Sequence, residues 1–390
     1  MNRAAIIGYG ISKFGKRTDA SMYDLIWEAG NEAIKMSGVN KNDIENLVVS
    51  NMGMWSSEEL PAVVAGEVLG LNNAGNMRVE AACASGSSAI ATAYDMIVSG
   101  RSKIVMVVGI EKMNEIGSET AIELIGRAGN FLWEYEMFGL TFPAYYALYA
   151  TAYMKKYSAK EEDLALVSVK NHHYASLNPI AHFQNEIKVE DVIKSRYVAW
   201  PLKLYDSSPI SDGAAAIIIA SDDIARSYTD SPIFIEGIGS NLGTSNLSKR
   251  NDFTEIEAAS KAARKAYKMA KIDYDKPWKQ IDGADVHDCF SIAEMMAYED
   301  LHFCERGGAV EMLRNNETYI GGKIPINTDG GLISKGHPIG ATGVAMAVEA
   351  CKQLLRKAES GRQIDIRNGK FLTHNVGGTG HYAYVTVYGI

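Results

Sequence analysis

Two stretches of the chain share one order of apolar and polar segments. Each opens with an apolar run that ends in glycines, "AAIIGYGISKFG" at 4–15 and "IFIEGIGSNLG" at 233–243. A segment with apolar residues at helical spacing follows each run, at 22–38 and at 255–272, and a short polar turn then leads to another apolar run. Short apolar runs bounded by glycine predict buried strands, and the helical spacing predicts amphipathic helices.

The parallel continues at two helix entries rich in small residues. They read "AACASGSSAIATAYDMIVSG" at 81–100 and "SKGHPIGATGVAMAVEACKQLL" at 334–355, and further strand-like segments follow at 103–111 and 370–389. Strands that alternate with helices through short links predict an α/β fold with helices over a sheet. Because the order occurs twice, we expect a duplicated fold whose halves pack through helices.

One segment has no counterpart in the second half. Residues 113–201 are rich in Tyr, Phe and Met, which is too apolar a composition for a disordered linker. We expect an inserted lid domain there, between an N-terminal half formed by 1–112 and 202–230 and a C-terminal half formed by 231–390. The N-terminal half resumes with a stretch that ends in "GAAAIIIAS" (213–221), whose apolar run predicts a central strand.

Composition excludes several classes of protein. The chain has 390 residues, of which 47% are apolar and 22% charged, and a net charge of −8 without a basic block argues against nucleic-acid binding. No apolar run approaches the roughly 18 residues that span a bilayer, and the N-terminus is too polar for a signal sequence. The four cysteines form no CxxC pair and no metal-ligand spacing, so we expect no disulfide, no metal and a reducing cytoplasm.

Cys83 stands among small residues at the start of a predicted helix. The free N–H groups and positive dipole of a helix N-terminus lower the pKa of a thiol, and the thiolate is the nucleophile. Small neighbours also admit a substrate carbonyl to backbone N–H groups, as an oxyanion hole requires. The other interpretation is a structural cysteine in a tight helix–helix contact, and the stretch alone leaves both open.

His337 occupies the corresponding helix entry of the second half. Glycines and a proline surround it in "SKGHPIGATG". If the repeat holds, the two helix tips meet near the pseudo-twofold axis, and Cys83 with His337 forms a nucleophile–base pair. An isolated histidine is more often a structural one, but one that faces a cleared cysteine from a glycine-rich turn favours catalysis.

Two further motifs supply candidates. "VHDCFS" at 286–291 follows a predicted strand, so His287 and Cys289 lie at its carboxyl end, with Asp288 between them directed to a structural partner. There His287 could donate to an oxyanion and Cys289 could carry a proton. "THNVGGTG" at 373–380 offers His374, Asn375 and free backbone N–H groups, although a plain hairpin explains it equally.

Three other patterns carry less weight. "GYGISKFG" lacks the third glycine of a dinucleotide fingerprint, since Lys13 stands there. The histidines at 172, 173 and 182 are interpreted as a solvated helix face rather than a metal site. "FGLTFPAYYALY" at 138–149 fits either an acyl pocket or the core of the lid, and we favour the core.

Five motifs together resemble the thiolase superfamily, most closely its sterol-carrier and archaeal acetoacetyl-CoA type. They are, in the family's order, "CASGSSA" (83–89), "SDGAAA" (211–216), "HDCF" (287–290), "GHPIGATG" (336–343) and "HNVGG" (374–378). The resemblance covers essentially the whole chain. It implies a duplicated fold in which two βαβαβαββ-type halves form a five-layered α-β-α-β-α core with an inserted loop domain.

The resemblance also implies roles for the motif residues. Cys83 would be the acylated nucleophile and His337 its activator, which also helps to stabilise the enolate. His287 would stand where many thiolases have an asparagine that holds a water. The backbone N–H groups of Cys83 and Gly377 would form the other oxyanion hole.

One position departs from the familiar thiolases. Their second, proton-shuttling cysteine belongs to a C-terminal Cys-x-Gly motif, and here that position is Asn375. In the sterol-carrier branch the second cysteine belongs to HDCF, which implies that Cys289 is the acid and base. Asn375 and Gly378 would contact the substrate.

The implied activity is ping-pong acyl transfer between two acetyl-CoA molecules, giving acetoacetyl-CoA and CoA, with no cofactor beyond the CoA of the substrate. A longer-chain ketoacyl-CoA thiolase and a ketoacyl-synthase-like condensing enzyme stay as alternatives, although the thiol of Cys289 favours a thiolase. A steroid-degrading aldolase of the same superfamily lacks the nucleophile that Cys83 supplies.

The resemblance implies a homodimer or a dimer of dimers. It also implies a role in mevalonate or lipid metabolism. A further alternative is a subunit that needs a small OB-fold protein bridging it to hydroxymethylglutaryl-CoA synthase. We expect neither nucleic acid nor membrane as a partner.

Overall fold

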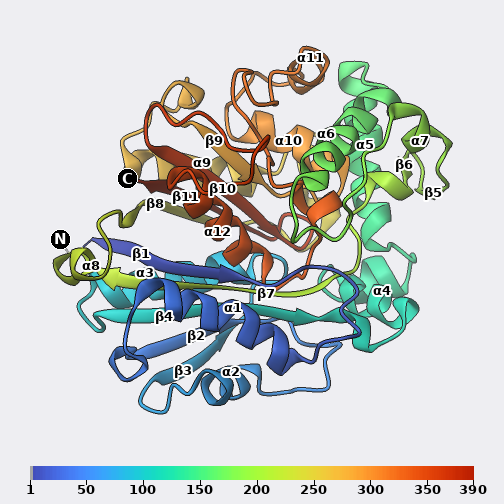
Figure 1. The fold of residues 1–390 in the computed structure, drawn as a ribbon. Coiled ribbons are helices and arrows are strands. Elements are labelled where there is room, and N and C mark those ends of the chain that lie inside the picture. Colours follow the sequence, from blue (N-terminus) through green and yellow to red (C-terminus); the bar gives the residue numbers. More distant parts are fainter. Residues whose placement is uncertain (1–2) are drawn as a thin grey trace.

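The structure is a computed structural model that describes residues 3–390. Its main sheet has nine strands in the order β3-β2-β4-β7-β1-β8-β11-β10-β9, and β5 and β6 form a separate ribbon. The first five strands of this order come from the N-terminal half of the chain and the other four from the C-terminal half (Figure 1). Two residue pairs, Ala5–Phe234 and Ile6–Ile233, join the halves between β1 and β8.

The N-terminal half follows the predicted alternation of strands and helices. Its elements are β1 (Ala4–Ile11), α1 (Met22–Ser37), β2 (Asn46–Ser50), α2 (Pro61–Leu69), β3 (Gly75–Val79), α3 (Ser85–Val98), β4 (Ile104–Lys112), β7 (Asp212–Ser221) and α8 (Asp222–Tyr228). β7, the predicted central strand, is buried along its whole length between β4 and β1. Strands buried on both faces carry the continuous apolar runs seen in the sequence.

The C-terminal half follows a similar order. Its elements are β8 (Ile233–Leu242), α9 (Glu257–Ala270), β9 (Gly283–Val286), α10 (Ser291–Asp300), α11 (Ala309–Arg314), α12 (Thr342–Leu354), β10 (Lys370–Gly377) and β11 (Tyr382–Gly389). Where the N-terminal half has β3, the C-terminal half has a single parallel bridge between Ala284 and Ile326.

Between β4 and β7 the chain leaves the sheet and covers one side of the molecule (Figure 1). This segment contains α4 (Ser118–Gly126), α5 (Phe142–Tyr157), α6 (Glu161–Ser176), α7 (Val189–Lys194), β5 (Tyr197–Ala199) and β6 (Leu202–Lys203). It matches the expected position of the insertion. The domain limits at 112, 201 and 230 stay a prediction.

Helices α3 and α12 lie between the two halves of the sheet. Their apolar side chains form one cluster with inward residues of β4, β7 and β10. On the outer faces, α1 and α2 cover the N-terminal strands and α9 covers β8 and β11 (Figure 1). The predicted five-layered α-β-α-β-α fold is thus confirmed.

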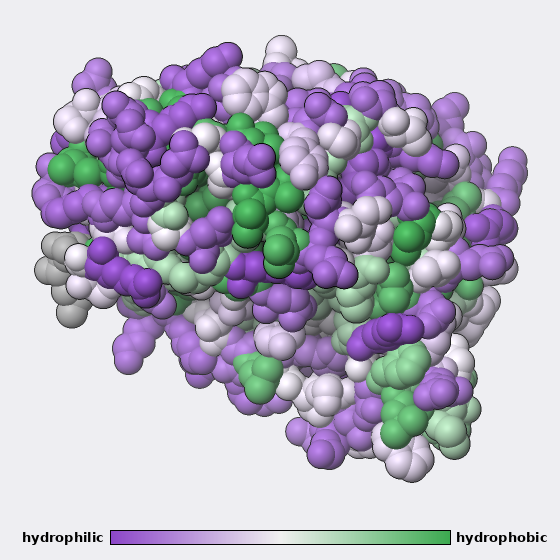
Figure 2. Space-filling model, turned by 90° about the horizontal axis from the view of Figure 1, so that it is seen from below, coloured by the Kyte–Doolittle hydropathy of each residue, from purple (hydrophilic) through white to green (hydrophobic). Residues whose placement is uncertain are grey.

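The surface is ordinary for a folded domain, with two exceptions. Figure 2 shows mostly hydrophilic residues with apolar ones in small groups on the face seen from below. Within seven residues of the insertion, four large apolar side chains are exposed: Leu132, Trp133, Met137 and Phe138. The edge strand β3 is also largely exposed. Among residues 3–390, no helix has the length and apolarity that a bilayer crossing requires.

The closest approach of α3 to α12 is made by glycines. A Cβ on Gly86 would lie 2.7 Å from the backbone nitrogens of Gly343 and Val344. Gly86→Ala must therefore push the two helices apart, and we expect the free energy of unfolding to fall by about 1–3 kcal/mol. Urea unfolding followed by circular dichroism measures the change.

A matched substitution serves as the control for this prediction. A Cβ on Gly117 would meet nothing within 4 Å, so Gly117→Ala should leave the unfolding midpoint within error. Equal unfolding curves for the Gly86 and Gly117 variants would show that the helix crossing tolerates a methyl group.

Candidate active site

Three of the predicted site residues converge from different elements. Cys83 stands just before α3, His287 follows β9, and His337 precedes α12. The Cys83 sulfur and one ring nitrogen of each histidine all lie within 4.8 Å of one another. The three side chains are buried, and the two imidazole rings meet edge to face with 5.2 Å between centroids. One point in the core therefore holds a thiol and two imidazoles.

Cys83 sits in a sharp bend between β3 and α3. Ala82 has a left-handed φ of +50°. The Ser85 hydroxyl holds the bend, because it accepts from the N–H of Ala81 (2.8 Å) and donates to the carbonyl of Ala82 (2.6 Å). The backbone N–H groups of Cys83 and Gly378 point at the sulfur. The bend thus presents the thiol to donors from both halves of the fold.

The net effect on the thiol is opposite to the one expected from the helix start alone. Burial raises the pKa of Cys83 to about 12, although the N–H groups of Gly378 and Cys83 lower it. Desolvation of the thiolate outweighs these donors. The expectation of a lowered pKa was wrong, because the sequence pattern predicts the start of the helix but not how deeply the thiol is buried.

The hydrogen bonds of His337 leave one ring nitrogen free as a base. The Thr342 hydroxyl donates its hydrogen to the carbonyl of Pro338 (3.0 Å), so it accepts from Nδ1 of His337 (2.7 Å). Nε2 of His337 then carries the lone pair, and it has no hydrogen-bond partner. Burial, with the charge of Lys335, lowers the pKa of His337 to about 3. His337 is therefore a neutral acceptor.

The hydrogen bonds of Asn375 give His287 the opposite tautomer. Nδ2 of Asn375 donates to the carbonyl of Cys83 (3.0 Å), and its second hydrogen points at Nδ1 of His287 (3.1 Å). The Ser87 hydroxyl donates to Oδ1 of the same amide (3.0 Å). Because Nδ1 accepts, the ring hydrogen of His287 is on Nε2, which is buried without a partner. Burial lowers the pKa of His287 well below its usual value, so it is a neutral donor.

Cys289 is the second thiol of the site. It is buried, and burial raises its pKa well above the usual range while the Tyr146 hydroxyl, which bonds to it, lowers it. Tyr146 also donates to the carbonyl of Gly378 (3.3 Å) and stacks on Phe290 at 4.7 Å between centroids. Tyr146 thus links Cys289 to the glycine turn that faces Cys83.

A cavity of about 220 Å³ opens onto the two thiols. Cys83, Cys289, His337 and Arg196 are among its lining residues. The rest of its lining is mainly apolar: Met113, Ile122, Ile125, Phe142, Pro143, Val198, Leu204, Phe290 and Ile339, among others. Phe142 and Pro143 of the segment 138–149 line this pocket, and Tyr145, Tyr146 and Tyr149, together with Phe142 itself, belong to the core.

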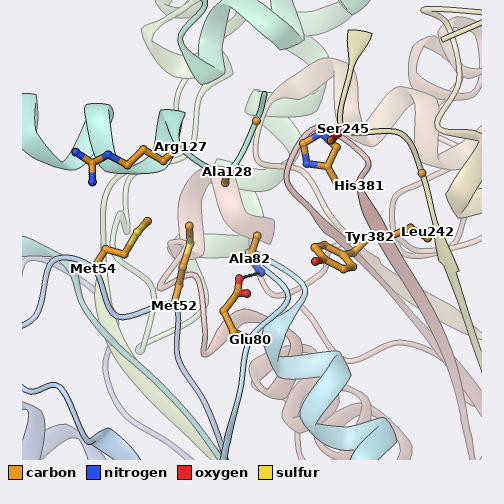
Figure 3. A pocket seen from close by; sticks show the side chains of 12 residues that line it. Met52, Met54, Glu80, Ala82, Arg127, Ala128, Leu242, Ser245, His381 and Tyr382 are labelled. Atoms are coloured by element: carbon orange, nitrogen blue, oxygen red, sulfur yellow. Dashed lines mark hydrogen bonds between the residues drawn. The ribbon is translucent and has the colours of Figure 1, made fainter. Parts of the chain in front are cut away.

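A larger cavity of about 550 Å³ lies beside the bend, without the sulfur in its lining. Figure 3 shows Met52, Glu80, Ala82 and Tyr382 around it, with Glu80 accepting from the N–H of Ala82. It flanks the loop that carries Cys83. Both thiols line the smaller cavity instead.

Sequence reasoning was also wrong about the histidine group, and it did not find two residues of the site. His172 is buried and its Nδ1 bonds to the carbonyl of Asn185, so only part of the histidine group is a solvated face. Tyr146 could not be singled out in a tyrosine-rich segment. Thr342 stands inside the GHPIGATG motif, five residues after His337, and could have been found there.

The predicted C-terminal contacts lie close to the thiol. Asn375 is buried behind Cys83, and its contact with substrate stays a prediction. A Cβ on Gly377 would lie 2.3 Å from the carbonyl oxygen of Ala81, which explains the glycine. The backbone N–H of Gly378 is directed at the Cys83 sulfur, and the oxyanion hole expected from Cys83 and Gly377 stays a prediction.

The family follows from comparison with known proteins. Residues 4–223 match the family described as "Thiolase, N-terminal domain", and residues 239–390 match "Thiolase C-terminal domain-like". The chain belongs to the thiolase family and is an acyltransferase of that family.

Individual relatives span the whole chain. An acetyl-CoA acetyltransferase of Methanothermobacter thermautotrophicus is 42% identical over 100% of both chains, and one of Methanocaldococcus jannaschii is 40% identical over 97% of each. Sterol carrier protein 2 of Homo sapiens is 31% identical over 100% of this chain and 72% of its own.

Solved structures share the fold. The "Ltp2-ChsH2(DUF35) aldolase" superposes with a TM-score of 0.84 at 24% identity, covering 99% of this chain and 97% of that one. An acetyl-CoA acetyltransferase from Syntrophomonas wolfei gives a TM-score of 0.74 at 19% identity, covering 100% and 99%.

The raised pKa predicts how Cys83 reacts with iodoacetamide. Because the pKa is about 12, the thiolate fraction grows tenfold with each pH unit far below that value. We expect the alkylation rate of Cys83 to rise continuously between about pH 6 and about pH 9. Mass spectrometry of the Cys83 peptide measures the rate, and a plateau near neutral pH would reveal a resting thiolate–imidazolium pair instead.

Proposed function

We propose that this thiolase is an acetyl-CoA C-acetyltransferase, which interconverts two acetyl-CoA molecules with acetoacetyl-CoA and CoA. The observation that carries the proposal is the meeting of Cys83, His287 and His337 within 4.8 Å, one histidine as acceptor and the other as donor. The names of the archaeal relatives, identical at 42% and 40%, support the acetyl group as substrate.

The first half-reaction uses the acceptor histidine. Nε2 of His337 takes the proton of the Cys83 thiol as the sulfur attacks the thioester carbonyl. The N–H groups of Cys83 and of the glycine turn at 377–378 stabilise the oxyanion. The carbon–sulfur bond to CoA then breaks, and the proton held by His337 passes to the departing CoA thiolate. Cys83 is left acetylated.

The second half-reaction uses the donor histidine. The thiol of Cys289 passes its proton to Nε2 of His337, and the resulting thiolate removes a proton from the methyl group of a second acetyl-CoA. The enolate oxygen accepts from Nε2–H of His287 and from the protonated Nε2 of His337, because a thioester α-proton is too weakly acidic for an unaided base. The enolate carbon attacks the acetyl group on Cys83, and the thiolate of Cys83 leaves and takes the proton held by His337. Thiolysis is the reverse sequence.

The cavity supports a short acyl group. Its volume of about 220 Å³ lies below the usual range for ligand pockets, and Phe142 and Phe290 belong to its lining. Arg196, in the cavity wall, is a candidate for contact with the CoA phosphates. The cavity therefore favours the acetyl enzyme over the longer-chain alternative.

The assembly is also part of the proposal. The exposed edge strand β3 supports a homodimer formed by strand addition. The exposed apolar side chains at 132–138 support a further partner, such as an OB-fold protein. The name of one structural neighbour includes a DUF35 component. The free cysteines of the described chain support a cytoplasmic location. The names of the archaeal relatives support a place in mevalonate or lipid metabolism.

Covalent acylation is the direct test of this function. Brief exposure to acetyl-CoA or acetoacetyl-CoA should add the mass of one acetyl group to the intact protein. Cys83→Ala should show no adduct and lose at least about 10³-fold in turnover. Cys351→Ala, which changes a buried cysteine of α12, should keep both. A folded wild-type chain without an adduct would exclude the short-chain thiolase.

Substitution of the second thiol should impair the second half-reaction and leave the first intact. We expect Cys289→Ala to keep the acetyl adduct on Cys83 but to lose at least about 100-fold in condensation, because the base for the α-proton is gone. Exchange of the methyl protons of acetyl-CoA with deuterated water, followed by NMR, should fall equally. Cys304→Ala is the control, and equal loss of adduct formation and condensation in Cys289→Ala would assign Cys289 another role.

A further inference from the structure

The carboxylate of Asp288 points away from the two candidates beside it in the chain. It is fully buried, and Oδ1 accepts from the N–H of Leu332 (2.6 Å). Oδ2 accepts from the N–H of Ile333 (3.2 Å) and from Nδ2 of Asn171 (2.7 Å). Three donors from two distant segments therefore meet on the residue between His287 and Cys289.

The first of these segments leads directly to the base. Leu332 and Ile333 belong to a turn of π-helix, Gly331–Lys335, which continues through Gly336 to His337. The carboxylate of Asp288 thus fixes the start of the loop that ends in His337. Its neighbours in the chain are His287, the donor histidine, and Cys289, the second thiol. The side chain of Asp288 thus connects His337 to His287 and Cys289, and condensation needs all three in fixed relative positions.

The second segment is helix α6 of the insertion. The amide of Asn171 bonds through Nδ2 to both Asp288 and Oε2 of Glu294 (2.8 Å). Nζ of Lys170 pairs with Oε1 of Glu294 (2.8 Å) and donates to the carbonyl of Ile326 (2.8 Å). All four side chains have 0% exposure. Buried charges need such complete pairing to persist.

The same cluster reaches the end of β9. Nδ2 of Asn327 donates to Oε2 of Glu294 (2.7 Å), and Oδ1 of Asn327 accepts from the N–H of Val286 (2.7 Å). Val286 is the last residue of β9 and precedes His287. The strand end is therefore held from both sides, by Asn327 before His287 and by Asp288 after it.

Glycine at position 331 shows how closely these groups pack. Gly331 has a φ of +57°, and a Cβ there would lie 2.2 Å from Oδ2 of Asp288 and 2.8 Å from Nδ2 of Asn171. The backbone runs directly against the hydrogen-bonded pair. Any side chain at position 331 would collide with Asp288 and Asn171. The close contact between the π-helical turn at 331–335 and the HDCF loop therefore requires glycine.

We propose that Asp288, together with Asn171 and Glu294, is a positioning unit that sets His337 against His287 and Cys289. The unit rests on the proposed acyltransferase function and deepens it. It touches no reacting atom and acts through the backbone on both sides of the cavity. Condensation needs both sets of groups aligned, whereas acylation of Cys83 needs His337 alone, so the unit should affect condensation more.

The test compares Asp288→Asn with Asp300→Asn. Asp300 is equally buried, accepts from the N–H of Ile256 and from Arg306, and lies at the far end of α10. For Asp288→Asn we expect kcat of condensation to fall about 10- to 100-fold with KM nearly unchanged, since small misplacements of reacting groups have costs of this size. Acetylation of Cys83 should fall less. Asp300→Asn should keep kcat in its folded fraction.

A second variant covers a failure of Asp288→Asn to fold. Asn171→Ser removes the amide from Asp288 and Glu294 but leaves the bonds to Leu332 and Ile333, and it should give the same pattern with a smaller fall in kcat. Unchanged kcat in a folded Asp288→Asn, or in a folded Asn171→Ser when the first does not fold, overturns the inference, as does an equal loss of acetylation and condensation. Absence of acetylation in the wild-type chain refutes instead the function on which the inference rests.

Discussion

The site depends on the close packing of α3 against α12 between the halves of the sheet. Both helices begin at the same end of this layer, so Cys83 before one and His337 before the other are brought together. Glycines at 86 and 343 allow the approach. The two interpretations of the small residues around Cys83 therefore coincide, because the helix contact that requires them is also the contact that builds the site.

Burial determines the protonation states of Cys83, His287 and His337. Burial raises the pKa of the Cys83 thiol and lowers that of both imidazoles, so the resting groups are neutral. Hydrogen bonds from outside the cavity, through Thr342 and Asn375, then make one imidazole an acceptor and the other a donor. Charge develops only as the reaction proceeds, where oriented donors in a water-poor site are most effective.

The sequence predicted the features that depend on local periodicity and order. The apolar runs became β1 and β8, the small-residue entries became the starts of α3 and α12, and the motif order identified the family. Features that depend on three-dimensional surroundings could not be read. Desolvation decided the sign of the pKa shift at Cys83, and Tyr146 was one of many tyrosines.

The ion pair between Lys170 and Glu294 has a consequence for how this protein could be redesigned. One partner belongs to the insertion and the other to the C-terminal half, and both are fully buried. A buried charge that loses its partner destabilises a protein by about 3–5 kcal/mol. In this protein, an insertion without a lysine at position 170 would leave Glu294 unpaired in the core. Because the insertion also lines the cavity, the pocket is more readily altered by substitutions at the cavity wall than by replacement of the whole segment.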